Sequence, residues 1–343
     1  MTVEVEFPGR SASVPSRLPE HTAPRIGSGG AGPAPLVIGL INNMPDSAVE
    51  GTETQFSSLL AAGSDSVHVR LRFATLPGVP RSPALASRIA DRYWDIRDVY
   101  DDPPDALIVT GTEPRAANLA DEPYWDALVR LMEFSRTGVC SSAWSCLAAH
   151  AAVQHFDGIH RRRLSVKRCG VYEHTLTSGH ALTIGLDAPL RTPHSRWNDL
   201  PLHALVKAGY GILSQSHETG ADAFVRTEDN LMLFFQGHPE YEGRTLLKEF
   251  QRDVGRFVAG TYTTYPTVPA GYFNADACKL LTDFETQLKA GKHSDPLAAF
   301  PFSAVAASLR NTWSQSAARI YSNWLGYVFS SKQNRAGGAR CAL

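Results

Sequence analysis

The chain of 343 residues has little cysteine. Its five cysteines are an odd number and are scattered, at positions 140, 146, 169, 278 and 341. The spacing holds no CxxC or CxxxC pair, which argues against a zinc site, and the odd number argues against a disulfide framework. Isolated thiols are typical of a reducing compartment, so we predict a cytoplasmic protein that binds no metal.

Long apolar runs and a strong net charge are missing too. No apolar stretch reaches the roughly 18 residues that a membrane-spanning helix needs, and no basic start followed by an apolar segment suggests a secretory leader. The formal net charge is −1, which gives no general attraction to nucleic acid or to an anionic membrane. The short basic run at 161–163 is typical of a solvated surface. We therefore expect neither a nucleic-acid nor a membrane partner.

No phosphate-binding motif lies between a predicted strand and a predicted helix, the position where such a motif binds phosphate. The sequence has no GxxxxGK[ST] loop, and no GxGxxG fingerprint joins a predicted strand to a predicted helix. By contrast, the hydrophobic content of 43% and the charged content of 20% are ordinary for a globular protein. The length suits one large domain or two modest ones with a substantial core.

The two ends of the chain differ in composition from the middle. Pro, Gly, Ser and Ala dominate residues 1–34 without periodicity, which predicts a disordered leader. Residues 331–343 have a similar character and predict a flexible tail, which makes Cys341 a poor candidate for chemistry. The interval 35–330 is predicted to be the folded domain.

Within that domain, short apolar runs alternate with amphipathic stretches. Strands are predicted at 35–41, 67–75, 105–111, 181–186, 221–227 and 230–237. Helices are predicted at 52–62, 122–136 and 242–258. This alternation predicts an α/β fold with a mainly parallel sheet and helices on both faces. Ligands of such folds bind at the carboxyl ends of the strands.

One of these strand ends carries a cysteine, in "SSAWSCLAAHAA". Cys146 follows an apolar strand that starts at Gly138 and precedes an Ala-rich helix. A nucleophile at such a turn projects from the sheet, and the start of a helix favours a thiolate. Small neighbours would let backbone amides approach a developing oxyanion. The alternative is a buried cysteine that acts as a small apolar side chain, and this stretch leaves both readings open.

Another strand ends in "FFQGHPEYEG". Pro239 fixes the backbone there, and Glu240 can orient and charge the imidazole of His238. A capped polar turn is the alternative, and the stretch alone favours it. A cysteine at one strand end and a His–Glu pair at another nevertheless indicate a Cys-His-Glu triad. Gly111 and Thr112, after the strand at 105–111, could offer an amide to an oxyanion, which is a common and therefore weak signal.

Several longer strings resemble the homoserine O-succinyltransferase family, whose fold is like that of class I glutamine amidotransferases (flavodoxin-like). They are "NNMPDSAVEGTETQFSSLL", "DALIVTGTEP", "GVYEH", "PHSRW", "GHPEYEGRTLLKEFQRDV" and "TWSQSAARIYSNWLGYVF". These strings follow one another in order from about residue 36 to residue 330. The resemblance therefore covers nearly the whole predicted domain.

The resemblance implies a role for each matching residue. Cys146 matches the nucleophile that accepts the acyl group, His238 the general base and Glu240 its partner. Arg252 matches an arginine that holds the carboxylate of the amino acid, and the segments of Ser195 and Lys167 line the substrate pocket of the family. The implied reaction takes an acyl group from acyl-CoA, a co-substrate rather than a bound cofactor, and follows ping-pong kinetics.

Two loops depart from the family pattern. The first, "MPDSAVEG", lacks the lysine that helps to stabilise the oxyanion, so the backbone amides of Gly111 and Leu147, or Lys167, are expected to serve. In the second, "TGTEPRAANL", one alignment places small Ala116 and cationic Arg115 at the donor-selecting position and favours succinyl. Another alignment places Glu113 there and favours acetyl. We expect succinyl.

Other readings stay open. Homoserine is the default acceptor of the family, with serine or another hydroxy amino acid as the alternative, and the product would serve methionine synthesis or a specialised pathway. A hydrolase like the glutamine amidotransferases, using the same triad, is one alternative function, and a non-catalytic binding homologue is another. The expected partners are small molecules, and the resemblance points to a homodimer as the assembly to test.

Overall fold

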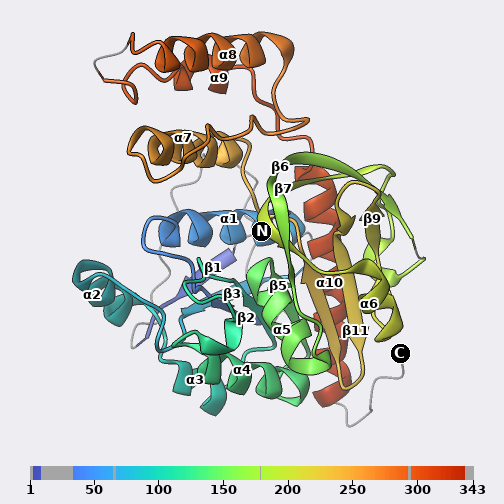
Figure 1. The fold of residues 1–343 in the computed structure, drawn as a ribbon. Helices are drawn as coiled ribbons and strands as arrows, with labels where there is room; N and C mark the ends of the chain where they lie inside the picture. The colour runs from blue at the N-terminus through green and yellow to red at the C-terminus, as the bar shows by residue number, and fades with distance from the viewer. Residues whose placement is uncertain (1–2, 9–33, 65–66, 178, 293–294, 337–343) are drawn as a thin grey trace, which may run out of the picture. The chain divides into compact units, whose positions relative to one another are not determined.

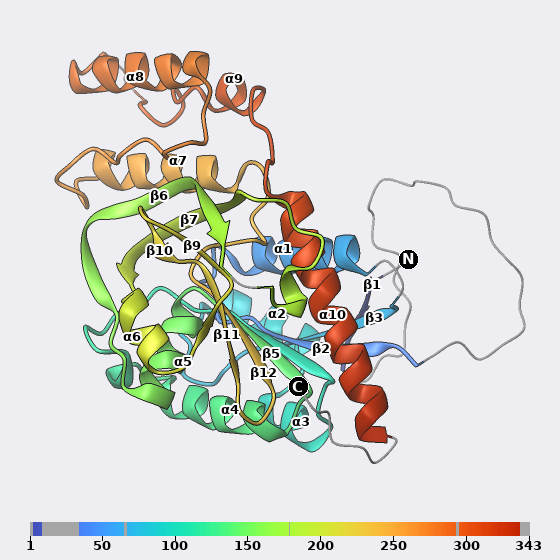
Figure 2. The same cartoon turned by 90° about the vertical axis from the view of Figure 1, so that its right-hand side faces the viewer.

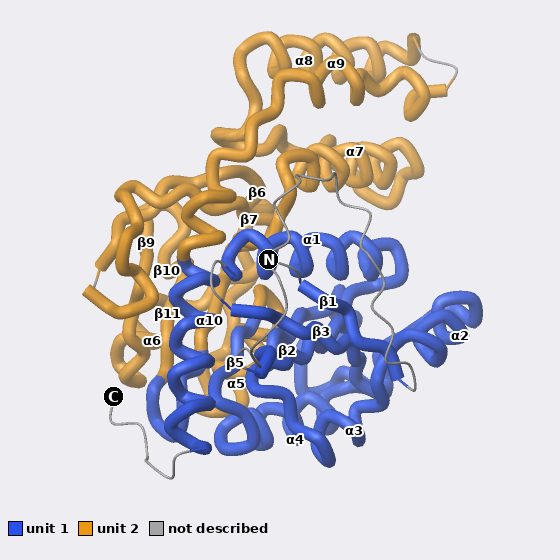
Figure 3. The backbone as a smooth tube through the Cα atoms, turned by 180° about the vertical axis from the view of Figure 1, so that it is seen from behind, with its two compact units in different colours: residues 1–144, 227–232, 320–343 blue, residues 145–226, 233–319 orange. Residues whose placement is uncertain are grey.

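The chain folds into two compact units, which Figure 3 colours separately. The computed structural model describes residues 3–8, 34–64, 67–177, 179–292 and 295–336. Unit 1 comprises Met1–Trp144, Thr227–Met232 and Ile320–Leu343, and unit 2 comprises Ser145–Arg226 and Leu233–Arg319. The interval 35–330, predicted as one domain, is thus divided between the two units. None of the described helices combines the length and the apolar character that crossing a membrane requires.

Unit 1 is built on a parallel sheet with the strand order β1-β3-β2-β4-β5 (Figure 1). Its strands are β1 Val3–Glu6, β2 Leu36–Ile41, β3 Val69–Ala74, β4 Ala106–Val109 and β5 Ser141–Ser145. The pairs β1–β3, β2–β3, β2–β4 and β4–β5 are all parallel. Every residue of β4 and β5 is buried, as expected of strands covered on both faces. The predicted α/β class with a mainly parallel sheet is confirmed.

Helices lie on both sides of this sheet. They are α1 Val49–Gly63, α2 Pro83–Arg92, α3 Ile96–Asp101, α4 Trp125–Thr137 and α10 Ser314–Ala336, with a short 3-10 helix η1 at Leu119–Asp121. Figure 2 shows α1 above the strands of unit 1 and α3 and α4 below them. The indole of Trp324 in α10 is fully buried and donates to Ser141 Oγ on β5 at 2.9 Å. The "IYSNWLGYVF" string therefore anchors the last helix to the sheet.

Unit 2 contains mostly antiparallel strands. A four-stranded sheet has the order β10-β9-β6-β7, and β12, β11 and β8 are neighbours in that order. The strands are β6 Arg162–Leu176, β7 Leu190–Asp199, β8 Gly211–Ile212, β9 Ser214–Ser216, β10 Gly220–Ala221, β11 Ala223–Thr227 and β12 Leu231–Phe235. The helices are α5 Leu147–Asp157, α6 Leu202–Lys207, α7 Thr245–Val258, α8 Ala275–Lys289 and α9 Phe302–Ala306, with η2 at Ala181–Thr183.

An aromatic core fixes α7 within unit 2. Phe250 of α7 and Phe284 of α8 both pack against Phe300, and Trp313 belongs to the same buried cluster. The Trp313 indole donates to the carbonyl of Tyr241 at 2.8 Å. This bond ties the loop between β12 and α7 to the core, so the segment that begins with Gly-His-Pro-Glu has a fixed backbone.

The structure corrects three expectations. Val3–Glu6, predicted as part of the leader, forms β1 because its alternating "VEVE" pairs in register with β3. Residues 181–186 form no strand: Ala181–Thr183 is a 3-10 helix, and Ile184 is 66% exposed at a turn. Helix α10 continues to Ala336, into the predicted tail. The remainder of the leader, 9–33, and of the tail, 337–343 with Cys341, lies outside the described residues.

Candidate active site

Cys146 lies at the turn between β5 and α5, at the beginning of unit 2. Its φ is +50°, and it is the only non-glycine residue in the described part of the chain with a positive φ. It is the N-cap of α5, and its amide donates to the carbonyl of Phe235 at 2.8 Å. A strained residue at a strand-to-helix turn is the geometry of a nucleophile elbow. The turn thus presents the sulfur at the carboxyl end of β5.

The surroundings of Cys146 leave backbone amides available. Ser145, Ala148 and Ala149 are small and buried, whereas Cys146 and Leu147 are half-buried. No side chain caps the N-terminus of α5. Because the first amides of a helix have no partner within the helix, the amide of Leu147 can donate to an oxygen that becomes negative beside the sulfur.

The loop after β12 brings His238 and Glu240 to Cys146. The imidazole of His238 hydrogen-bonds the thiol of Cys146, and its Nδ1 lies 2.8 Å from Glu240 Oε1. Ser145 Oγ donates to the same carboxylate oxygen at 3.4 Å. On the imidazole face, the ring of Tyr241 stacks with a centroid separation of 4.2 Å. The structure therefore brings together the three residues that the sequence predicted as a Cys-His-Glu set.

The electrostatics of the set favour a charged imidazole. Burial alone would lower the pKa of His238, but the charge of Glu240, the Cys146 sulfur and the hydrogen bonds to both hold this pKa well above its ordinary value. His238 is only 7% exposed, so these partners are little screened by water. An imidazolium beside a thiol sulfur is the environment of reactive cysteines.

Replacing Glu240 by glutamine is expected to lower the pKa of His238, because the neutral amide no longer offsets the burial of the imidazolium. In the wild type, a folded-state pKa above the unfolded value of about 6.5 stabilises the fold fully below that pH. This stabilisation is lost as the pH rises through the folded-state pKa. The free energy of unfolding of the wild type should therefore exceed that of Glu240→Gln by the largest amount at low pH. Urea denaturation from about pH 5.5 to 9.5 measures this difference.

The matched control is Glu242→Gln, which changes an exposed glutamate two residues further along the loop. It should follow the wild-type curve. A difference between Glu240→Gln and wild type that stays constant across the whole pH range would contradict the proposed pairing with His238.

A second group of polar side chains gathers on α7. Ser195 Oγ donates to Glu249, and the hydroxyl of Tyr241 donates to Glu249 Oε1 at 2.7 Å. Lys167 Nζ donates to Asp253 Oδ2 at 2.6 Å and lies 4.0 Å from Glu249 Oε2. Ser195 and Lys167, which the resemblance placed in a substrate pocket, thus meet at two carboxylates. Tyr241 connects this group to the ring of His238.

Arg252 belongs to the same helix and remains accessible. Its side chain is 46% exposed, and Nη2 lies 3.3 Å from Asp253 Oδ1. Burial acts to lower the pKa of Arg252, but the charges of Glu249 and Asp253 outweigh it and raise that pKa. This face of α7 presents fixed charges of both signs, which can pair with the carboxylate and the ammonium of an amino acid.

Tyr241, Glu249 and Asp253 were not predicted from the sequence. A signal was present, because Glu249 and Asp253 stand three residues before and one residue after Arg252 within a predicted helix. Helical spacing places Glu249 and Arg252 on one face, and Glu249 and Asp253 likewise. The stacking of Tyr241 on His238 could not be found in this way, since it depends on the loop conformation.

Gly111 and Thr112, predicted to face an oxyanion, and Arg115 and Ala116, predicted to select the acyl donor, lie in unit 1. Gly111 and Thr112 follow β4, and the amides of Arg115 and Ala116 each donate to Glu122 Oε1 at 2.6 Å. Glu122 is 5% exposed. A buried carboxylate therefore fixes the backbone of this loop, while the roles of the four residues stay predictions.

The first loop of unit 1 lacks lysine but is held by an arginine. The guanidinium of Arg81 donates to the carbonyls of Met44 and Asn42, the latter at 3.0 Å, and lies 3.7 Å from Asp46. Its side chain is 9% exposed, and burial lowers the pKa of Arg81. This cation comes from the segment after β3, so the loop sequence alone did not reveal it.

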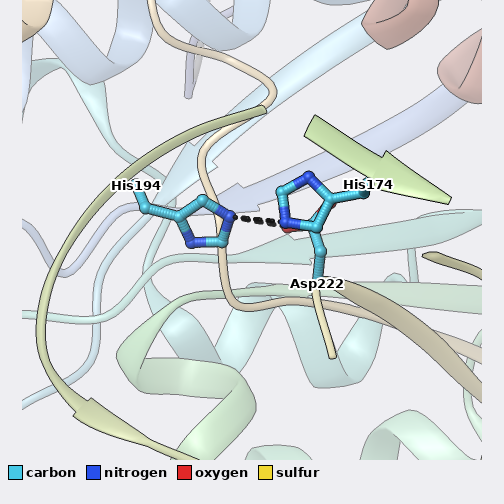
Figure 4. Close-up of side chains that lie close together, drawn as sticks. All are labelled: His174, His194 and Asp222. Carbon is cyan, nitrogen blue, oxygen red and sulfur yellow. Dashed lines mark hydrogen bonds and ion pairs between the residues drawn. The ribbon is translucent and has the colours of Figure 1, made fainter. Parts of the chain in front are cut away.

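Among the described residues, one group has the ligand types and spacing for a metal ion: His174, His194 and Asp222 (Figure 4). All three are buried, and their candidate ligand atoms lie within 4.8 Å of one another. Arg196 Nε donates to His194 Nδ1 at 3.3 Å. Burial, with the charge of Arg196, holds the pKa of His194 well below its ordinary value, so the ring is neutral. With a neutral ring, a metal on Nε2 would place the proton on Nδ1 and break this bond from Arg196.

Comparison with known proteins shows what this chain is similar to. A family model described as homoserine O-succinyltransferase matches residues 31–335. The homoserine O-succinyltransferase of Rhodopseudomonas palustris is 44% identical over 290 residues, which are 84% of this chain and 87% of that protein. The one from Bradyrhizobium japonicum is 41% identical over 297 residues, 86% of this chain and 91% of that protein. A solved glutamine amidotransferase structure from Thermotoga maritima aligns with a TM-score of 0.48 at 12% identity, covering 85% of this chain and 98% of that one.

Proposed function

The chain belongs to the homoserine O-succinyltransferase family, and we propose that it moves a succinyl group from succinyl-CoA to the hydroxyl of homoserine. The observation that carries the chemistry is the hydrogen-bonded set of Cys146, His238 and Glu240 at the elbow between β5 and α5. The names of the relatives support succinyl as the acyl group and homoserine as the acceptor.

The first half-reaction forms an acyl-enzyme. The proton of the Cys146 thiol first passes to His238. The thiolate then attacks the thioester carbonyl, the carbonyl oxygen becomes negative, and the amide of Leu147 stabilises it. The bond to the sulfur of CoA then breaks, and His238 gives its proton to that leaving group. The product is a succinyl thioester on Cys146, and His238 is left neutral.

The second half-reaction transfers the acyl group. Neutral His238 takes the proton of the homoserine hydroxyl as the oxygen attacks the thioester carbonyl. The carbon–sulfur bond breaks, which returns Cys146 beside a protonated His238. Glu240 stabilises that cation in both halves. Because CoA leaves before homoserine reacts with the acyl-enzyme, ping-pong kinetics are expected. No redox change and no further reactant is required.

A screen of CoA release tests the proposal. Succinyl-CoA and acetyl-CoA are each incubated with homoserine and with serine, and free thiol is measured. We expect the highest kcat/KM for succinyl-CoA with homoserine, and a mass increase of one succinyl group when succinyl-CoA is supplied alone. Glutamine hydrolysis without CoA release would favour the hydrolase alternative, and the absence of both activities the non-catalytic homologue.

Arg252→Ala is expected to raise the KM for homoserine by roughly 10- to 100-fold, because a charged hydrogen bond to the substrate carboxylate is lost. Formation of the acyl-enzyme should stay within about twofold of wild type, since this half-reaction does not involve the amino acid. Arg256→Ala is the matched control. That arginine also lies near Asp253, at 3.7 Å, one helical turn further along. Equal damage to both half-reactions would point to a structural role for Arg252.

A further inference from the structure

Three consecutive backbone amides hold the segment that carries His238. The amide of Gln236 donates to the carbonyl of Asp222 at 2.8 Å, and the amide of Gly237 donates to the carboxylate Oδ1 of the same residue at 3.2 Å. The amide of His238 donates to the carbonyl of Pro193 at 2.8 Å. Asp222 therefore receives two of the three bonds, one through its backbone and one through its side chain.

The carboxylate of Asp222 is itself fixed from several directions. It is 2% exposed. Thr192 Oγ1 and Ser214 Oγ donate to Oδ2 at 3.0 and 3.2 Å. On the other oxygen, His194 Nε2 lies 3.4 Å from Oδ1, and the same nitrogen hydrogen-bonds His174 Nε2 at 3.3 Å. Figure 4 shows both imidazole rings close to Asp222. A buried carboxylate with this many donors cannot shift without breaking several bonds.

The fit at Gly237 makes the contact close as well as fixed. A Cβ added at Gly237 would lie 2.6 Å from Asp222 Oδ1 and 2.6 Å from Thr192 Cγ2. Only glycine lets the backbone approach the carboxylate so closely. The position of the loop is thus set by its packing against Asp222 and against Thr192 of β7, and not by the loop alone.

We propose that Asp222 is a positioning residue for His238: its carboxylate oxygen holds the Gly237 amide and so sets the imidazole against Cys146. This inference rests on the proposed function, in which His238 is the acid and base. His194 packs against the same carboxylate, with Nε2 3.4 Å from Oδ1, and its ring is held by the bond from Arg196 Nε to Nδ1.

The test compares Asp222→Ala with Asp222→Asn. Alanine removes the acceptor for the Gly237 amide, so the imidazole moves, and a displacement of about 1 Å costs up to about 100-fold in kcat. The KM for homoserine should change little, within about twofold, since Arg252 and Ser195 stay in place. Asparagine keeps an acceptor oxygen, and its NH2 group can donate to the two hydroxyls. It should restore most of the activity that alanine loses.

A second measurement does not depend on acyl transfer. The rate at which iodoacetamide alkylates Cys146 is followed against pH, which reports how well the imidazole is placed beside the sulfur. Asp222→Ala should lose reactivity at about pH 6, whereas Asp222→Asn should keep it. Asp157→Asn is the matched control: Asp157 pairs with Tyr210 and Arg226, each at 2.6 Å, and should leave the alkylation profile unchanged.

If Asp222→Ala does not fold, Gly237→Ala tests the proposal instead. Its added methyl displaces the contact between the backbone of residue 237 and the Asp222 carboxylate while leaving the carboxylate in place. An unchanged alkylation profile in the folded variant would overturn the proposal. The proposal would also be overturned if Asp222→Asn were as impaired as Asp222→Ala. A third contrary result would be one zinc ion bound per wild-type chain and lost in Asp222→Asn. Failure of wild-type protein to form a succinyl adduct would contradict the proposed function, while the alkylation comparison would still judge the positioning role.

Discussion

Replacing Cys146 by alanine is expected to abolish transfer and to remove the acyl adduct. The loss in kcat should reach about 10⁴- to 10⁶-fold, the scale seen when a covalent nucleophile is deleted. Intact-mass measurement after incubation with succinyl-CoA alone should show wild-type protein heavier by one succinyl group and Cys146→Ala unchanged. The physical reason is that Cys146 supplies the sulfur that interacts with His238.

Cys278→Ala provides the matched control, because Cys278 is a free and half-buried cysteine like Cys146. It lies in α8 and should leave both the adduct and kcat unchanged. Cys146→Ser should resemble alanine, since a hydroxyl at this position has a much higher pKa than a thiol and is a poorer nucleophile. A wild-type adduct that persists in Cys146→Ala would refute the assignment of the nucleophile.

Two central strands of unit 1, β2 and β4, could be predicted because they are continuous apolar runs. The run predicted at 35–41 is β2 Leu36–Ile41, and the one at 105–111 contains β4 Ala106–Val109. Burial on both faces leaves little choice of residue, so the pattern is unambiguous. Such burial is imposed by the sheet, which explains why the parallel part of the fold was the easiest to derive.

The long strands of unit 2 gave no comparable signal. The strand β6 Arg162–Leu176 begins with "RRLSVKR", and its first five residues are exposed or half-exposed. β7 Leu190–Asp199 mixes buried histidine and arginine with exposed positions. Their stability depends on the antiparallel pairing of β6 with β7 and on hydrogen bonds among buried polar groups. These partners are far apart in the sequence, and hydrophobic periodicity does not report them.

The residues of the candidate site also differ in how well the sequence predicts them. Cys146, His238 and Glu240 stand at strand ends, where topology alone brings side chains together. Asp222 stands in a short segment before β11, and its importance appears only when the Gly237 amide is seen to meet its carboxylate. A residue that acts by holding a backbone group has no motif, because the group it holds is present at every position.

Replacing His238 by asparagine is expected to slow both half-reactions. Asparagine can keep a hydrogen bond to Glu240 but cannot exchange a proton, and general acid–base groups contribute about 10²- to 10⁴-fold. The formation of the succinyl adduct should therefore be slowed together with kcat. This pattern distinguishes the role of His238 from that of Arg252, because the loss of Arg252 should affect only the second half-reaction.

Alkylation of Cys146 near neutral pH should also slow in His238→Asn, because the sulfur loses its positively charged neighbour. His203→Asn, which changes an exposed histidine of α6, is the control and should behave like wild type. Rapid formation of the adduct in His238→Asn, at the wild-type rate, would mean that another group protonates the departing CoA. The Glu240–His238 pair would then serve the transfer to homoserine alone, and the charged imidazole beside Cys146 would need a different explanation.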